Sequence, residues 1–159
     1  MEHNVRALPP ELLVQRLPEL LEDAQAVPLI ISGSSMSPFL VHGRDTVYLS
    51  KVTGPLKRGD MIFYRRASGA CVLHRICAVE GETYSLIGDA QSVIERGIRR
   101  GQVMAMVTAV SRKGKLLQKG CFWWDFFEKV WLRLIPARRL LVRLYSFFRG
   151  GRNGENAHD

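Results

Sequence analysis

Residues 32–40, Ser-Gly-Ser-Ser-Met-Ser-Pro-Phe-Leu, gather hydroxyl side chains in a stretch that proline keeps from regular strand pairing. The apolar residues 27–31 precede this stretch and predict a short strand. A strand that ends in Gly-Ser-Ser-Met can present one hydroxyl at a tight turn, where Gly33 lets the backbone approach a substrate carbonyl closely. The pattern fits a serine nucleophile, although a plain polar turn has the same composition.

A serine hydroxyl attacks a carbonyl well only when a base accepts its proton, and histidine is the side chain best tuned for this near neutral pH. The chain has four histidines, two of them near the termini. Of the others, we expect His42 in the loop after the serines and His74 in the middle of a strand. Strand alternation places His74 on an apolar face, where a histidine is also a common core residue.

The elements that would position these side chains are mostly strands. Their alternating, β-branched and aromatic residues predict strands over residues 45–49, 61–64, 71–79, 83–87 and 102–110. Because the turns between them are short, an antiparallel, partly closed sheet is expected. An amphipathic helix opens at Pro9-Pro10-Glu11, and Pro18 predicts a kink or break in it.

The net charge of +8 is concentrated in the last third of the chain: residues 1–110 carry +1 and residues 111–159 carry +7. A nearly neutral body argues against nucleic acid as a partner. Three cysteines without a C-x-x-C pair favour a reducing compartment, and no His/Cys spacing predicts a metal or other cofactor. Without a signal-peptide pattern or a run of about 18 apolar residues, we expect a location in the cytoplasm or on the cytoplasmic face of a membrane.

The segment 121–149 is rich in both aromatic and basic residues, and it predicts two helices separated at Pro136. Its tryptophans and arginines suit a peripheral helix on an anionic membrane surface. A helical hairpin packed on the sheet or on a second subunit explains the same pattern.

Four motifs follow one another along residues 27–110: Gly-Ser-Ser-Met-Ser-Pro, Arg-Gly-Asp, Leu-His-Arg-Ile and Leu-Ile-Gly-Asp. In this order and spacing the chain resembles the signal peptidase I and LexA-like serine peptidase superfamily. The resemblance implies the coiled antiparallel sheet of that superfamily. It also implies that the serine before methionine, Ser35, is the nucleophile.

The base and its acid follow from the same resemblance. Bacterial signal peptidases and LexA-like proteins use a lysine, whereas the eukaryotic, archaeal and SipW-like signal peptidases use the histidine of a His-Arg pair, which matches His74-Arg75. Asp89 matches the aspartate of the Gly-Asp motif, and Glu95 stands at the triad position, where the family usually has aspartate. The alternative is that Asp89 only caps a turn and Glu95 is solvated.

The substrate loop implied by the resemblance contains Gly33, Ser34 and Met36. Many bacterial signal peptidases carry a serine at the position of Gly33, so the oxyanion hole would depend on backbone N–H groups, chiefly that of Ser35.

The sequence therefore predicts a mainly β serine endopeptidase that resembles signal peptidase I and cleaves a peptide or leader segment through an acyl-enzyme. The competing interpretation is an inactive peptidase-fold module that binds a peptide or docks at a membrane. The expected parts are an N-terminal helix (1–26), the peptidase-like body (27–110), a basic, aromatic helical extension (111–149) and a disordered tail (150–159).

Overall fold

The chain forms one open antiparallel sheet with helical segments before and after it, in a computed structural model that describes residues 10–137 and 140. Helix α1 covers Pro10–Asp23. The strands of the described residues are β1 (Val27–Ile30), β2 (Asp45–Ser50), β3 (Met61–Arg65), β4 (Cys71–Glu80), β5 (Thr83–Ile87), β6 (Glu95–Arg99), β7 (Val103–Arg112) and β8 (Lys115–Gln118). The shorter helical segments are η1 (Arg100–Gln102), α2 (Phe122–Asp125), the π-helical η2 (Phe126–Val130) and the 3-10 helix η3 (Trp131–Ala137). The predicted mainly β class is confirmed.

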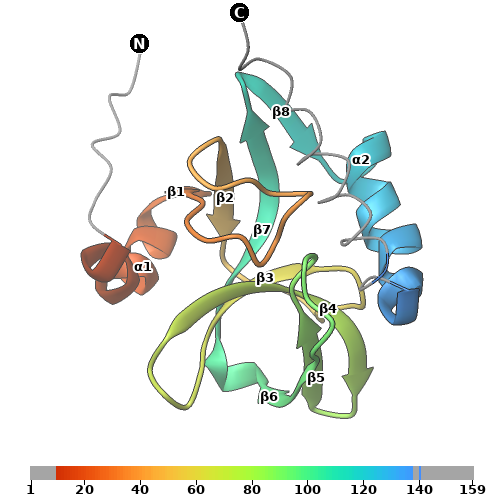
Figure 1. Ribbon diagram of the computed structural model, residues 1–159. Coiled ribbons are helices and arrows are strands. Elements are labelled where there is room, and N and C mark those ends of the chain that lie inside the picture. Colours follow the sequence, from red (N-terminus) through yellow and green to blue (C-terminus); the bar gives the residue numbers. More distant parts are fainter. Residues whose placement is uncertain (1–9, 138–139, 141–159) are drawn as a thin grey trace, which may run out of the picture.

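The strands lie in the order β1-β2-β7-β3-β4-β5-β6, and β8 pairs with β7 (Figure 1). All of these pairings are antiparallel. Strands β1 and β6 are the ends of this path, so each has one strand neighbour among the described residues. Strand β7 is long enough to pair with β2, β3 and β8, and it therefore joins the two halves of the sheet.

Two strands were not predicted from the sequence. Strand β6 reads Glu-Arg-Gly-Ile-Arg and buries only Ile98, so it lacks the alternation that marks a strand. Strand β8 lies beyond residue 110, where the sequence placed the end of the body. The sheet instead continues, because β7 runs to Arg112 and β8 returns beside it. Helix α1 runs through Pro18, whose position on the exposed side leaves the buried contacts of Leu17 and Leu21 in place.

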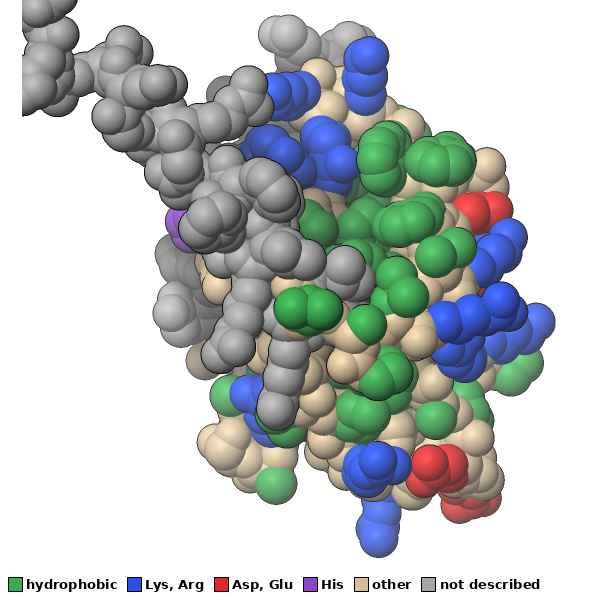
Figure 2. Space-filling view, turned by 45° about the vertical axis from the view of Figure 1, so that its right-hand side comes forward, with side chains coloured by type: hydrophobic (Ala, Val, Ile, Leu, Met, Phe, Trp, Pro, Cys, Tyr) green, Lys and Arg blue, Asp and Glu red, His purple; other side chains and the backbone are tan. Residues whose placement is uncertain are grey.

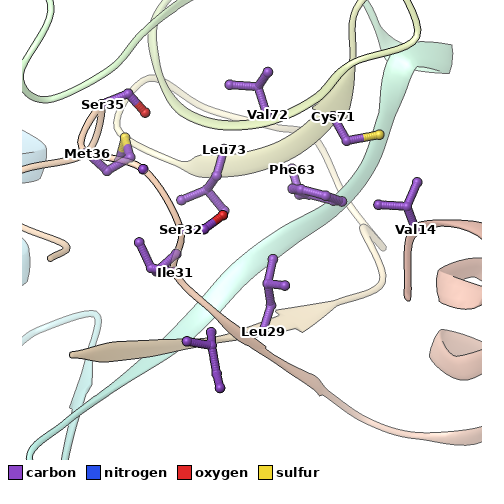
Figure 3. Close-up of a pocket in the computed structure, with 12 residues that line it drawn as sticks. Val14, Leu29, Ile31, Ser32, Ser35, Met36, Phe63, Cys71, Val72 and Leu73 are labelled. Atoms are coloured by element: carbon purple, nitrogen blue, oxygen red, sulfur yellow. The ribbon is translucent and has the colours of Figure 1, made fainter. Parts of the chain in front are cut away.

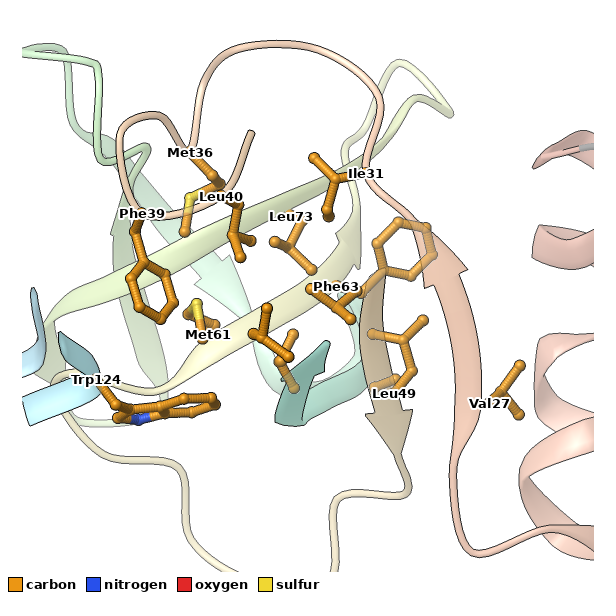
Figure 4. Close-up of a cluster of buried hydrophobic side chains, with 14 of the residues drawn as sticks. Val27, Ile31, Met36, Phe39, Leu40, Leu49, Met61, Phe63, Leu73 and Trp124 are labelled. Carbon is orange, nitrogen blue, oxygen red and sulfur yellow. The ribbon is translucent and has the colours of Figure 1, made fainter. Parts of the chain in front are cut away.

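The sheet separates two hydrophobic clusters, and β3 contributes to both. Its residues Met61 and Phe63 face the larger cluster, and Ile62 and Tyr64 face the smaller one. The larger cluster also takes side chains from α1, from the loop after β1 and from the C-terminal helical segments; these include Leu17, Leu21, Met36, Phe39, Leu40, Trp124 and Phe127. Figure 4 shows Met36, Phe39 and Leu40 of the loop and Trp124 in this cluster. Strand β3 is buried on both faces, so the side chains where β3 and β4 pair lie deep in the protein.

The first part of the predicted C-terminal extension packs on the sheet. The rings of Trp124 and Phe127 lie 5.9 and 5.0 Å from the ring of Phe39, measured between centroids. Both side chains are buried, so this part of the extension belongs to the hydrophobic core. Of the second predicted helix, which follows Pro136, only Ala137 and Leu140 are described, and the predicted tail over residues 150–159 lies outside the described residues.

Candidate active site

The serine loop between β1 and β2 is held at its base by backbone hydrogen bonds. The N–H of Ile31 donates to the carbonyl of Asp45 at 3.0 Å, and the N–H of Gly43 donates to the carbonyl of Ile31 at 2.9 Å. Gly33 has a φ of +87°, a left-handed conformation that favours glycine and turns the chain after β1. The side chain of Met36 is buried and holds the loop against the core. The neighbouring Ser35 is partly buried.

The backbone of Ser35 lies against the turn after β5. The N–H of Ala90 donates to the carbonyl of Ser35 at 2.8 Å. Gly88 comes so close that a Cβ at this position would stand 2.5 Å from the same carbonyl oxygen. Close backbone approach therefore requires glycine here. Among the described residues no acceptor engages the Ser35 N–H, so this group is available to a substrate oxygen.

His74 lies in the middle of β4, opposite Ile62 of β3, and its side chain is 1% exposed. The predicted apolar strand face is confirmed, because Val72 and Ile76 belong to or contact the smaller cluster. The ring Nδ1 lies 3.1 Å from the hydroxyl of Tyr64, which reaches it diagonally from the neighbouring strand. His74 is therefore a buried histidine whose orientation is set by a tyrosine.

Glu95 completes this network from the start of β6. The Tyr64 hydroxyl donates to Oε2 of Glu95 at 2.8 Å, and Oε1 of Glu95 lies 3.6 Å from Nδ1 of His74. The guanidinium of Arg66 pairs with the Glu95 carboxylate, and this hydrogen bonding lowers the pKa of Glu95. Glu95 is thus ionised at neutral pH and accepts the hydrogen bond that the Tyr64 hydroxyl donates.

The same network assigns the histidine tautomer. Since the Tyr64 hydroxyl donates its one hydrogen bond to Glu95, its oxygen accepts a hydrogen bond from Nδ1–H of His74. The lone pair of the neutral ring is then on Nε2. That nitrogen is buried and has no hydrogen-bond partner among the described residues. An imidazole nitrogen in this state can accept a proton from a group brought beside it.

Burial keeps the His74 ring neutral. It lowers the pKa of His74 to about 4, against the smaller opposing effect of the Glu95 charge, and Arg66 lowers it further. Burial and then the hydrogen bond to Glu95 raise the pKa of the Tyr64 phenol. Both groups therefore keep these protonation states throughout the neutral pH range.

Asp89 pairs with Arg75 and makes no hydrogen bond to His74. Its carboxylate accepts two hydrogen bonds from Arg75, at 3.1 and 3.0 Å, and both side chains are fully buried. Arg75 also donates to the carbonyl of Gly59 at 3.0 Å. Because successive strand residues point to opposite faces, Arg75 and its partner lie across β4 from His74. Of the two acids left open by the sequence, Glu95 is the one beside His74.

No hydrogen bond joins Ser35 to His74. The cavity beside Ser35 is lined by Phe63 and Leu73 of the larger cluster, whereas His74 lies on the strand face of the smaller cluster. Ser35 adjoins Gly88, one residue after Ile87, which pairs with Arg75 in the β4–β5 register. The other candidate base, His42, is exposed, and its Nδ1 accepts a hydrogen bond from the Gly33 N–H at 3.2 Å. That contact gives His42 a role in shaping the loop.

A cavity of about 190 Å³ opens beside Ser35. Figure 3 shows the Ser35 side chain at one end of it, with Leu29, Phe63 and Leu73 among the apolar side chains along its walls. Edge strand β1 forms one wall and β3 and β4 form another. The arrangement can hold a short apolar group next to a serine hydroxyl. Within the described residues, no group of three or more His, Cys, Asp or Glu side chains could hold a metal ion.

Sequence reasoning missed Tyr64 and Arg66. The run around Tyr64 reads only as a strand, and nothing in it indicates which residue of the next strand it will meet. Comparison with known proteins adds no further guide, because neither a protein-family model nor a curated protein matches the chain. Among the described residues, no helix is both long and apolar enough to span a membrane.

Proposed function

We propose that the protein is a serine endopeptidase with the fold and Ser/His mechanism of the signal peptidase type. The observation that carries the proposal is the state of His74: buried, neutral, protonated at Nδ1 through Tyr64 and Glu95, and unpartnered at Nε2. A core histidine with no chemical role would be expected to satisfy both ring nitrogens. The order of the four sequence motifs and the contact between Ser35 and the Gly88 turn support the same interpretation.

In the proposed mechanism, Ser35 Oγ attacks the carbonyl carbon of the scissile bond while Nε2 of His74 removes its proton. Catalytic hydrogen bonds often form only in the substrate complex, so the Ser35–His74 contact belongs to the bound state. The Ser35 N–H stabilises the oxyanion, and the Glu95 charge stabilises the imidazolium. The imidazolium then protonates the leaving amine, and water, activated by the same histidine, hydrolyses the acyl-enzyme.

The proposed substrate is an extended peptide that adds to the outer edge of β1, where no other strand of the described residues pairs. Alternate side chains of such a peptide point to one face, and the cavity beside Ser35 has room for a small apolar one. The free cysteines Cys71, Cys77 and Cys121 favour action in a reducing compartment such as the cytoplasm.

A serine-directed acylating probe tests the proposal. We expect labelling of Ser35, located by peptide mass analysis, no labelling in Ser35→Ala, and much slower labelling in His74→Ala. If folded wild-type protein resists the probe but binds extended peptides, the second candidate holds, namely an inactive peptide-binding module. The missing Ser35–His74 hydrogen bond is the observation that favours this candidate.

A further inference from the structure

The helical segments between Phe122 and Ala137 have an inner and an outer side. Trp124, Phe127 and Leu132 are buried on the inner side. On the same side, the indole N–H of Trp131 donates to the carbonyl of Asp89 at 2.8 Å. These contacts fix the segment to the protein, so its outer side is held in one orientation.

The outer side exposes large apolar groups. Phe122 is 72% exposed, Trp123 is 53% exposed and Val130 is 44% exposed. The rings of Phe122 and Trp123 contact each other, with centroids 5.2 Å apart, and partly buried Phe126 extends the group. Figure 2 shows hydrophobic side chains gathered on this face of the molecule, beside groups of Lys and Arg. Contiguous exposed aromatic side chains are typical of a surface that contacts a membrane or another protein.

The charges around this aromatic surface are mainly positive. Lys129 and Arg133 are exposed residues of the same helical segments, on the side away from the core. Residues 112–137 contain six basic and two acidic residues. The carboxylate of Glu128 is turned inward, 12% exposed and paired with Lys119. That of Asp125 is paired with Lys129.

We propose that this surface, Phe122, Trp123, Val130, Lys129 and Arg133, docks the protein on an anionic lipid bilayer. Phenylalanine and tryptophan rings insert at the level of the headgroups, and the cations meet lipid phosphates. A second copy of the chain would bring the same positive surface opposite itself across a twofold axis, which is unfavourable. An anionic membrane supplies both the apolar phase and the opposite charge.

The test measures co-sedimentation of the full-length protein with vesicles of phosphatidylcholine alone or mixed with phosphatidylserine, at low and high salt. We expect binding only to the mixed vesicles and release by salt. The double variant Phe122→Ser/Trp123→Ser should lose about tenfold or more of the binding. The matched control is Val93→Ser, since Val93 is 68% exposed but lies outside the surface, and it should bind as the wild type does.

A second measurement locates the contact. Brominated lipids in the mixed vesicles should quench Trp123 fluorescence, and Trp123→Phe should bind but show little quenching, because Trp124 is buried and Trp131 is partly buried. Quenching that persists in Trp123→Phe, or vesicle binding unchanged in the double variant, overturns the proposal. So does a dimer in solution that the double variant converts to a monomer, since the surface is then an interface between copies.

Discussion

The hydroxyl of Tyr64 stands between His74 and Glu95, 3.1 Å from Nδ1 of the histidine and 2.8 Å from the carboxylate. A histidine base is usually oriented by direct contact with an acid. Here the direct Nδ1–Oε1 distance is 3.6 Å, so the phenol carries the main hydrogen bond. Tyr64 is therefore a positioning residue in the proposed mechanism, because it acts on the substrate only through His74.

Tyr64→Phe should shift the His74 tautomer while the protein stays folded. Without the hydroxyl, Nδ1–H loses its acceptor, so the proton is no longer held on that nitrogen. The ¹⁵N chemical shifts of the ring measure this redistribution whether or not the protein is an enzyme. If it is a peptidase, kcat/KM should fall about tenfold, the equivalent of one hydrogen bond.

Tyr84→Phe is the matched control for that variant. Tyr84 is also a buried tyrosine of the smaller cluster, but no hydrogen bond links it to His74. Its substitution should leave the His74 resonances and the activity unchanged. If both variants shift the tautomer equally, the effect comes from general packing and Tyr64 has no positioning role.

Ser35→Ala and His74→Ala should each lower the rate of peptide cleavage by at least about 10⁴-fold, because nucleophile and base act as a unit. His42→Ala should retain most of the activity, since His42 is exposed and its ring accepts a hydrogen bond from the Gly33 N–H of the loop backbone. Circular dichroism controls for folding. A loss in His42→Ala as large as that in His74→Ala means that His42 is the base.

The pH dependence follows from the burial of His74. An unperturbed histidine titrates near 6.5, and from the sequence alone the activity would be expected to rise through that pH. Because burial lowers the pKa of His74 to about 4 in the free protein, we expect kcat/KM to rise near pH 4 and to be level from about pH 5.5 to 7.5. A half-maximal point near pH 6.5 would mean that His74 is solvated in the active form.

The same shift makes stability depend on pH. In the unfolded chain His74 binds a proton below about pH 6.5, whereas in the folded chain it does so only below about pH 4. The unfolded state therefore binds more protons between these values, and the free energy of unfolding falls as the pH falls through this window. The contribution of His74 is on the order of 3 kcal/mol. Urea unfolding at pH 4 and pH 7, compared between wild type and His74→Gln, measures it.

How far the sequence predicts the site depends on the kind of contact. The period of two along residues 71–79 correctly placed His74 on an apolar face. Tyr64 could not be predicted, because its contact depends on the β3–β4 register that sets Ile62 opposite His74. Register is decided by the whole sheet, which one strand's pattern does not contain.

The sequence could not decide whether Asp89 or Glu95 orients His74, for a similar reason. Asp89 ends the Leu-Ile-Gly-Asp motif and Glu95 comes six residues later, and this spacing does not tell which face of β4 each will reach. Glu95 reaches His74 from β6, a strand whose charged sequence gave no signal of its own. Pairing of β6 with β5 brings Glu95 opposite Leu86, and this tertiary contact overrides the weak local propensity.

Asp89→Asn and Glu95→Gln should therefore fail in different ways. Asp89→Asn leaves the fully buried Arg75 without its counter-charge, which should destabilise the fold by about 3–5 kcal/mol. Glu95→Gln removes a partly buried charge beside His74 and should lower the activity with a smaller loss of stability. Urea unfolding and peptide cleavage, measured on both variants, separate these effects. Equal stabilities would contradict the structural role of Asp89.

The C-terminal helical segments should be needed for folding. The sequence predicts that the peptidase-like body ends at residue 110, but a cut after Val110 falls inside β7 and removes β8, Trp124 and Phe127 from the core. We now expect the truncated chain to unfold or aggregate.

Trp124→Ala isolates the packing contribution of the helical segments and should lower the free energy of unfolding by about 3–5 kcal/mol, because the indole fills the space beside Phe39. Trp123→Ala is the matched control: the neighbouring ring is half exposed, so its loss should change the free energy of unfolding much less. If the two variants are equally stable, or the truncated chain unfolds cooperatively like the wild type, the segment is an appendage and the core ends with the sheet.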